Sequence, residues 1–453
     1  HADYARRFHA GGNWLTMELS SLALIACAFP EFRDAAAWRA YVIDKMQAEL
    51  HTQIYPDSVQ MELTTHYHWV TLRNYELLLG YLDTGGVPAD AAFRTSVEGM
   101  WNYLAGVMRP DGHVLLNNDS DLDHQAPRLA VRAKRFNRPD WLHIATAGRE
   151  GACPEGAPGR FYPWAGQAVF RSGWDADARW SFFDIGPWGI GHQHNDKLHF
   201  ELAAYGRTLL TDSGRFAYDG AVARRFRKYA CSAAGHNVIL VDSFGQAPGP
   251  RMATEPLPEA ACRIGGKFSY AAGDMDAFEK IEGTVRHRRA VLFLDPVWIV
   301  VDRIETNRPR TIESLWHFQP ACTVRQDGCG AITTDAGAGN VRIVPAGLTA
   351  DAAPIIFRGR EGDRVQGWYS REYQQFVPTA TLSVEQRLMG NATFAWVFVT
   401  AKGAVPAVTA SLREPDAEAP EVTVDVTGLG RIVARIPIAP DAGAATANME
   451  RCK

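Results

Sequence analysis

Apolar residues in the first third of the chain recur at the spacing of helices. They return every three or four positions between residues 34 and 50, between 67 and 82, and between 97 and 108. Asp34 suits the N-cap of the first stretch. The connections are short, and short connections favour antiparallel neighbours. The pattern therefore predicts a bundle or toroid of antiparallel helices.

From about residue 160 the apolar period changes from helical to two. The clearest alternating stretches are 168–171, 200–202, 237–241, 291–294, 297–301 and 394–399, with Gly, Pro and Asp between them. Such punctuation is typical of stacked antiparallel sheets. We predict an α+β multidomain fold in three segments. Residues 1–155 are helical, 156–385 form a β-sandwich region, and 386–453 close the sandwich or form a small sheet.

Composition excludes some classes of protein. The 453 residues carry a formal net charge of −4 at pH 7, which disfavours a basic nucleic-acid binder. No run of eighteen apolar residues occurs, so membrane insertion is not expected. The first residues lack the apolar core of a signal peptide, and we expect any such leader to have been removed.

Two histidines in Gly191-His192-Gln193-His194-Asn195-Asp196 are the first candidates for chemistry. On a strand His192 and His194 would share a face, allowing joint metal ligation or one ligand beside one base. On a loop entering a sheet they would only be polar residues. Asp212 and His236 sit beside predicted strands, and two imidazoles with a carboxylate suit Zn²⁺.

The order of several motifs resembles the heparinase II/III family. The sequence GHxHxD is followed by a short strand, by Leu210-Thr211-Asp212-Ser213-Gly214 and by Gly235-His236-Asn237. Further matches at 298–302 and 367–373 extend the resemblance over nearly the whole chain. It implies an α/α-toroid followed by an antiparallel β-sandwich, with polysaccharide cleaved in the cleft between them.

The resemblance also assigns residues. It implies a structural zinc ion held by His194, Asp212 and His236, and a catalytic His192 facing the cleft. Asn13 and Tyr67 would be the catalytic residues of the helical part. Asn13 precedes Trp14 where several relatives have Asn-His, which points to the heparinase III branch.

The chemistry implied is β-elimination from a uronate. Asn13 would neutralise the sugar carboxylate, although without the family an N-cap is the simpler role for it. Tyr67 would be the general acid, with His192 as base in an anti elimination, or would act alone in a syn elimination.

Supporting roles are predicted for five further residues. Glu62 is expected to orient Tyr67 or His68, or else to be a surface or capping carboxylate, and both Glu62 and His68 are assigned to substrate binding. The arginines expected to grip sulfate or carboxylate, unless they only form a solvated face, are Arg224, Arg225 and Arg227. Residues 118–123 lack the pattern of a calcium loop and are expected to line the cleft instead.

We therefore predict a polysaccharide lyase acting on a uronic-acid glycan, heparin or heparan sulfate first and alginate second. A zinc hydrolase and a non-catalytic glycan-binding protein are the alternatives from other classes. The expected partner is an acidic polysaccharide, and oligomers are possible. Asn13 lies almost at the start of the chain, so we expect a companion N-terminal helical piece. The predicted location is the periplasm or the medium.

Overall fold

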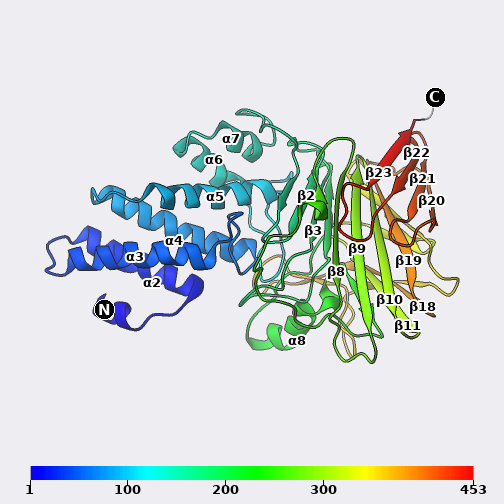
Figure 1. Ribbon diagram of the computed structural model, residues 1–453, viewed down its shortest axis with the longest axis horizontal. Helices are drawn as coiled ribbons and strands as arrows, with labels where there is room; N and C mark the ends of the chain where they lie inside the picture. The colour runs from blue at the N-terminus through cyan, green and yellow to red at the C-terminus, as the bar shows by residue number, and fades with distance from the viewer. Residues whose placement is uncertain (1, 452–453) are drawn as a thin grey trace.

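The first part of the molecule is a helical arm (Figure 1). The computed structural model describes residues 2–451. The helices are α1 (Ala2–Arg7), α2 (Gly12–Ala28), α3 (Ala35–Gln53), α4 (Thr65–Thr84), α5 (Ala91–Val107), α6 (Ala126–Arg135) and α7 (Pro139–Ala145). All three predicted helical stretches fall within α3, α4 and α5, apart from Asp34 at the N-cap and Met108 at the C-cap.

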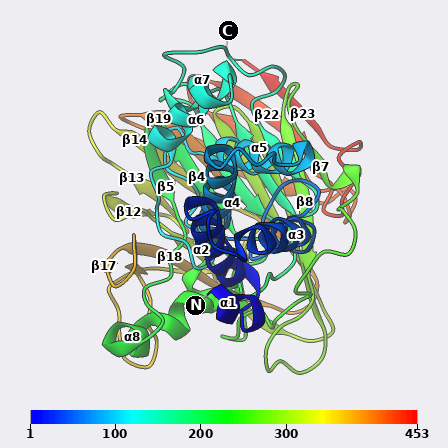
Figure 2. The same cartoon turned by 90° about the vertical axis from the view of Figure 1, so that its left-hand side faces the viewer.

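The arm is a partial α/α-toroid built from neighbouring helices. α2 packs on α3 and on α4, and α6 packs on α7, as the end-on view shows (Figure 2). Apolar stripes such as Val97, Met100, Trp101 and Leu104 of α5 are fully buried between them. Burying a side chain of this size stabilises the fold by about 1.5–3 kcal/mol. The apolar side chains that recur at helical spacing in the sequence therefore form the core that stabilises the arm.

The second part is built from antiparallel sheets. A five-stranded sheet contains β1 (Arg160–Tyr162), β2 (Gln167–Arg171), β3 (Trp180–Asp184), β4 (Phe200–Ala204) and β5 (Arg207–Leu210) in sequential order. An eight-stranded sheet follows the order β12 (Val324–Asp327), β13 (Gly330–Thr333), β14 (Gly339–Ala346), β19 (Ala392–Lys402), β10 (Val297–Thr306), β9 (Val285–Leu294), β8 (Ser269–Met275) and β7 (Cys262–Arg263).

Two smaller sheets and a two-stranded hairpin complete the β part. One sheet has the order β15 (Ala353–Arg358), β18 (Ala380–Leu388), β11 (Arg310–His317) and β6 (Ile239–Val241), and β16 (Trp368–Tyr369) pairs with β17 (Val377–Pro378). The last sheet contains β20 (Val408–Arg413), β21 (Glu421–Val426), β22 (Gly430–Arg435) and β23 (Thr446–Glu450). Along the chain, helix α8 (Gly220–Cys231) comes after β5 and before β6.

The eight-stranded sheet is the middle layer of the β part. On β10, Trp298 and Val300 pack into one core with the five-stranded sheet and the β6-containing sheet. Ile299 and Val301, on the opposite face, pack into a second core with the terminal sheet. A strand buried on both faces explains the continuous apolar run at 297–301.

The structure corrects one predicted boundary. The division at residue 386 falls inside β18, a strand of the main sandwich. The separate small sheet begins at Val408, because β19 pairs with β10 and β14 in the middle layer. The six predicted strands all coincide with observed ones, although in 237–241 only residues 239–241 are extended.

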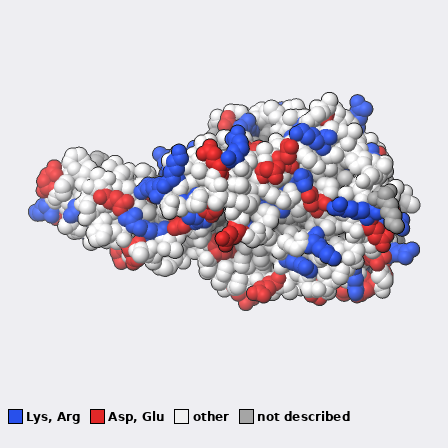
Figure 3. All heavy atoms as spheres, turned by 90° about the horizontal axis from the view of Figure 1, so that it is seen from above, with Lys and Arg blue, Asp and Glu red and all other residues white. Residues whose placement is uncertain are grey.

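Among residues 2–451, no helix is both long and apolar enough to cross a bilayer. Seen from above, charges of both signs are interspersed over the strand-built part (Figure 3). Basic side chains gather on the helical arm near its junction with the strands.

Candidate functional site

The candidate site lies where loops of the β part meet the helical arm. The contributing segments are the β3–β4 loop, residues 211–218 after β5, the turn after α8, and residues 108–125 between α5 and α6. The first turns of α2 and α4 approach from the arm. Thr64 caps α4 by accepting a hydrogen bond from the Tyr67 amide at 2.9 Å, which fixes where that tyrosine leaves the helix.

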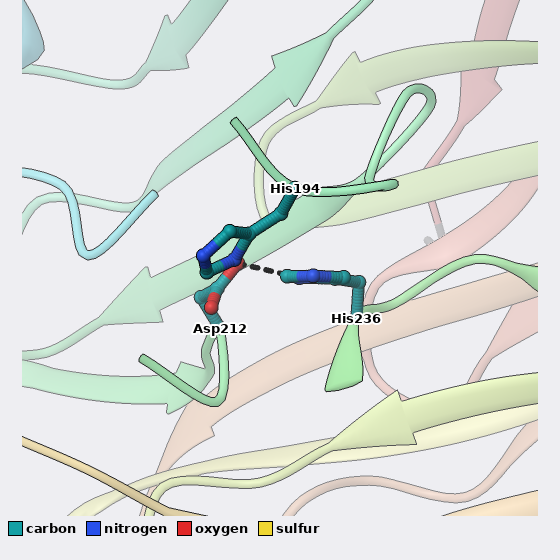
Figure 4. Close-up of side chains that lie close together, drawn as sticks. All are labelled: His194, Asp212 and His236. Atoms are coloured by element: carbon teal, nitrogen blue, oxygen red, sulfur yellow. Dashed lines mark hydrogen bonds and ion pairs between the residues drawn. The ribbon is translucent and has the colours of Figure 1, made fainter. Parts of the chain in front are cut away.

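Three predicted metal ligands converge in the β part. His194, Asp212 and His236 are fully buried, and one ligand atom from each lies within 4.8 Å of the others. His236 Nδ1 lies 2.8 Å from Asp212 Oδ2, and His194 approaches from the β3–β4 loop (Figure 4). The predicted convergence of these residues, called the metal cluster below, is confirmed.

The metal cluster fits a divalent cation. Nδ1 of His194 and Nε2 of His236 are buried and have no hydrogen-bond partner among residues 2–451. Such orphaned nitrogens are costly unless something binds them. Burial opposes ionisation of Asp212, but the charge and hydrogen bond of His236 outweigh it and hold the pKa of Asp212 well below its usual range. A carboxylate beside two imidazoles is a donor set that suits Zn²⁺.

His192 and His194 do not lie on a strand. The β3–β4 loop carries both, which is the second of the two placements that the sequence left open. Their imidazoles nevertheless turn to the same group, Asp119. His192 Nδ1 lies 3.1 Å from Asp119 Oδ2, and His194 Nε2 lies 2.9 Å from Asp119 Oδ1.

Asp119 is one of the site residues whose role sequence reasoning missed. It is fully buried, and Arg227 of α8 binds both of its oxygens. Burial opposes its ionisation, but hydrogen bonds from His192, His194 and Arg227 hold the pKa of Asp119 well below its usual range. One carboxylate thus joins the metal cluster to the cleft. The expectation that residues 118–123 line the cleft anticipated the place but not this role.

Tyr67 stacks on His192. Their rings are 3.5 Å apart and only 8° from parallel. The Tyr67 hydroxyl lies 2.7 Å from the hydroxyl of Tyr218, and Tyr218 lies 3.3 Å from His192 Nδ1. Arg215, paired with Asp121, donates to Tyr218 at 3.1 Å. Tyr218 and Arg215 had no sequence signal, because a single Tyr or Arg in a loop looks like any other.

The environment keeps Tyr67 protonated. Burial raises the pKa of Tyr67 above its ordinary value of 10.0, and its hydrogen bond with Tyr218 and the Arg215 guanidinium offset only part of that rise. A protonated tyrosine at neutral pH is suited to donate a proton.

Asn13 pairs with Glu62 across the arm. Asn13 Nδ2 donates to both Glu62 oxygens, at 2.9 and 3.1 Å. The N-cap of α2 is Gly11, so Asn13 does not cap the helix. Glu62 contacts Asn13 and lies 3.8 Å from His192 Nε2, which corrects the expectation that it orients Tyr67 or His68. Burial raises the pKa of Glu62 above its ordinary value.

The prediction that His68 binds substrate is wrong. His68 is fully buried, its Nδ1 accepts from the Gln60 amide at 3.2 Å, and its Nε2 lies 3.0 Å from the Met100 carbonyl oxygen. Burial lowers the pKa of His68 to about 4, so it is a neutral core residue. Adjacent residues on a helix point about 100° apart, which is why Tyr67 reaches the cleft and His68 does not.

Two of the three predicted arginines of α8 are exposed. Arg225 forms an ion pair with Glu361 and packs over Trp368, while Arg224 faces solvent. Arg227 is the arginine of this helix that reaches Asp119. Binding of substrate by Arg224 and Arg225 stays a prediction.

The helical arm, the sandwich and the metal cluster define a two-domain protein of the toroid-and-sandwich class. Models of the heparinase II/III N-terminus and the heparinase II/III-like C-terminal domain match residues 1–137 and 154–409. The chain belongs to the heparinase II/III family.

Curated relatives agree with this assignment. A heparin-sulfate lyase of Bacteroides stercoris is 28% identical over 69% of this chain and 46% of its own length. One of Pedobacter heparinus is 26% identical over 67% of this chain and 46% of its own length. This chain therefore spans about half the length of these relatives.

Among solved structures, a heparinase III matches with a TM-score of 0.82 and 20% identity over 100% of this chain and 68% of that one. The heparan sulfate lyase of Pedobacter heparinus matches with a TM-score of 0.78 and 22% identity over 96% of this chain and 68% of that one. These similarities confirm the fold.

Proposed function

We propose that this chain carries the active site of a polysaccharide lyase that cleaves a heparin- or heparan-sulfate-like glycan by β-elimination. The observation that carries the proposal is the stacking of Tyr67 on His192, beside the Asn13–Glu62 pair. Residues from the arm and the β part meet there, in a family whose relatives named above are heparin-sulfate lyases.

The reaction removes the proton alpha to the uronate carboxylate and expels the 4-O-linked sugar. The charge that develops on the carboxylate requires a preorganised donor, and the Asn13 amide, fixed by Glu62, is suited to this role. Glu62 has a raised pKa and adds little negative charge next to the substrate when it is protonated.

His192 and Tyr67 divide the proton transfers. His192 is 18% exposed at its side chain, and its Nδ1 side is occupied by Asp119 and Tyr218, which leaves Nε2 facing Glu62 and the cleft. We assign His192 as the base and Tyr67 as the acid that protonates the leaving oxygen. The raised pKa of Tyr67 supports the acid role over the syn route, in which Tyr67 must first ionise.

We propose a structural Zn²⁺ in the metal cluster, held by His194, Asp212 and His236. A catalytic zinc site keeps one open position for water or substrate, whereas all three of these residues are fully buried. This burial disfavours a zinc hydrolase. The ion would supply stability to the loops that carry His192 and His194.

The substrate assignment follows the relatives rather than the site. The two relatives above are named heparin-sulfate lyases, which favours heparan sulfate over alginate. Because such polymers do not enter cells readily, we also propose a periplasmic or secreted location.

A helical companion piece is proposed for the arm. Trp14, Met17 and Leu24 form an exposed apolar stripe along α2, and these residues are 63%, 37% and 45% exposed. A stripe of this kind marks an interaction surface. The preceding helices of a longer chain would cover it. Self-association that survives their addition would instead support an oligomer.

Ultraviolet absorbance of the product tests the lyase proposal. An unsaturated uronate absorbs, whereas the substrate does not. We expect absorbance to rise with heparan sulfate and to stay flat with alginate. If absorbance rises with no uronate polymer, the lyase proposal is overturned. If it rises with alginate alone, the assignment of heparan sulfate as substrate is overturned.

A further inference from the structure

A groove lined by arginines runs along the helical arm between α4 and α6. It encloses about 460 Å³ and its walls include Arg73, Arg128, Arg132 and Arg135 together with Trp69 and Tyr81. None of these residues contributes to the metal cluster or to the Tyr67–His192 stack. It is called the arginine groove below.

The arginine groove carries an excess of positive charge. Arg132 donates to Glu76 at 2.8 and 3.1 Å, and Arg135 lies 3.8 Å from Asp83, which also pairs with Arg94. Within residues 2–451 no ion pair involves Arg73 or Arg128, and both side chains are exposed. Two guanidinium groups thus remain available to an anion.

Aromatic rings and a buried carboxylate give the groove a defined shape. Arg128 lies over the Trp69 ring at 5.0 Å. Buried Glu76 accepts hydrogen bonds from Arg132 and, at 2.9 Å, from the Trp101 indole. The contacts of Glu76 fix the floor of the groove, while Arg73 and Arg128 have no carboxylate partner among residues 2–451. Guanidinium groups pair bidentately with sulfate and carboxylate.

The groove and the candidate site share helix α4 but use different faces of it. Tyr67 lies in the first turn of that helix, and the lining residues extend from Trp69 to Thr84, about 22 Å at 1.5 Å per residue. The other wall, α6, follows directly on the segment that contains Asp119. A polymer long enough to pass round α4 can therefore contact both the site and the groove, whereas a short oligosaccharide held in the site cannot.

We propose that the arginine groove is a second binding site for acidic polysaccharide, which holds sulfate or carboxylate groups several sugar units away from the bond that is cleaved. The identity of this polysaccharide rests on the proposed function, whereas the binding of a polyanion does not. The groove would therefore act on long chains and leave short oligosaccharides unaffected.

The test compares two double variants in a Tyr67→Phe background, so that binding is measured without turnover. Arg73→Ala/Arg128→Ala removes the unpaired guanidinium groups. Arg325→Ala/Arg413→Ala removes the same charge from exposed positions on β12 and β20. Calorimetry with a heparan sulfate polymer and with a heparan sulfate tetrasaccharide gives each Kd.

We expect the groove variant to bind the polymer about tenfold more weakly, to bind the tetrasaccharide unchanged, and to show a shallower salt dependence. The control should stay within about twofold of the parent at the same ionic strength. Equal polymer binding by both variants would overturn the proposal, as would equal weakening for both ligands, since the arginines would then belong to the cleft. A lower unfolding midpoint than the control would also overturn it, by making the arginines part of the fold. Failure of the lyase assay leaves this binding test intact, so the two proposals fail separately.

Discussion

The metal cluster and the cleft beside it share one carboxylate, Asp119, but differ in what surrounds them. His194, Asp212 and His236 have no exposed surface, and every segment that supplies them belongs to the β part. Tyr67 and His192 are partly accessible and come from different parts, and Tyr218 is 41% exposed. Each group contains polar side chains at hydrogen-bond distance.

This difference indicates that the metal cluster stabilises the fold, whereas the group in the cleft performs the chemistry. A closed set of ligands lacks room for a substrate, so binding energy there contributes to folding. A half-exposed acid and base at a domain junction can meet a polymer and still be positioned from both sides.

Tyr67→Phe should reduce kcat by about 10² to 10⁴-fold, the range of a lost acid–base group. The phenyl ring can still stack on His192, so the free energy of unfolding should fall only by the lost hydrogen bond to Tyr218, about 0.5–1.5 kcal/mol. Tyr205→Phe, at the turn after β4, is the matched control. If the variant kept the kcat of the parent, Tyr67 would not be the general acid.

His236→Ala should lower the free energy of unfolding by about 3 kcal/mol, because it leaves Asp212 buried without its partner. Denaturant unfolding measures this change, with exposed His51→Ala as control. A chelator should likewise lower the midpoint. If chelation stops turnover while the protein stays fully folded, the metal takes part in the chemistry and the comparison fails.

Asp119→Asn should affect both groups, since its carboxylate contacts His192 and His194. Loss of a hydrogen-bond partner behind a metal ligand typically costs roughly 10- to 100-fold in metal affinity or activity. We expect a fall in kcat together with weaker metal retention, measured by steady-state kinetics and by metal content after dialysis. A change in only one of the two would show that Asp119 does not couple them.

Glu62→Gln should change the pH dependence of stability. Burial raises the pKa of Glu62 in the folded state above its ordinary 4.5, so between these values the unfolded chain binds fewer protons than the folded one. Stability of the parent should therefore fall, relative to Glu62→Gln, as pH rises through this window. Urea unfolding of both proteins from about pH 4 to about pH 8 measures the gap. If the parent instead becomes more stable relative to Glu62→Gln as pH rises, the pKa of Glu62 is not raised in the folded protein.

Much of the fold could be predicted from residue patterns, because apolar period and burial are linked directly. The stretch 297–301 became a strand buried on both faces, and the helical stripes became the core of the arm. The metal cluster could be predicted because the motifs around His194, Asp212 and His236 resemble a family.

The remaining site residues depend on contacts that the sequence does not show. Glu62 was assigned to its near neighbours, although its partner Asn13 lies far away along the chain. Asp119 sits in an acidic run that resembles a calcium loop, and only the fold brings it against two histidines. His68 shares a motif with Tyr67 but points into the core.

The most direct test of the central claim follows the fate of water when the protein cleaves heparan sulfate in H₂¹⁸O. Elimination splits the glycan without adding water, so the masses of the two products should sum to that of the substrate, with no ¹⁸O incorporated and an unsaturated uronate at the new end. Incorporation of one ¹⁸O per bond cleaved would mean hydrolysis and would contradict the account.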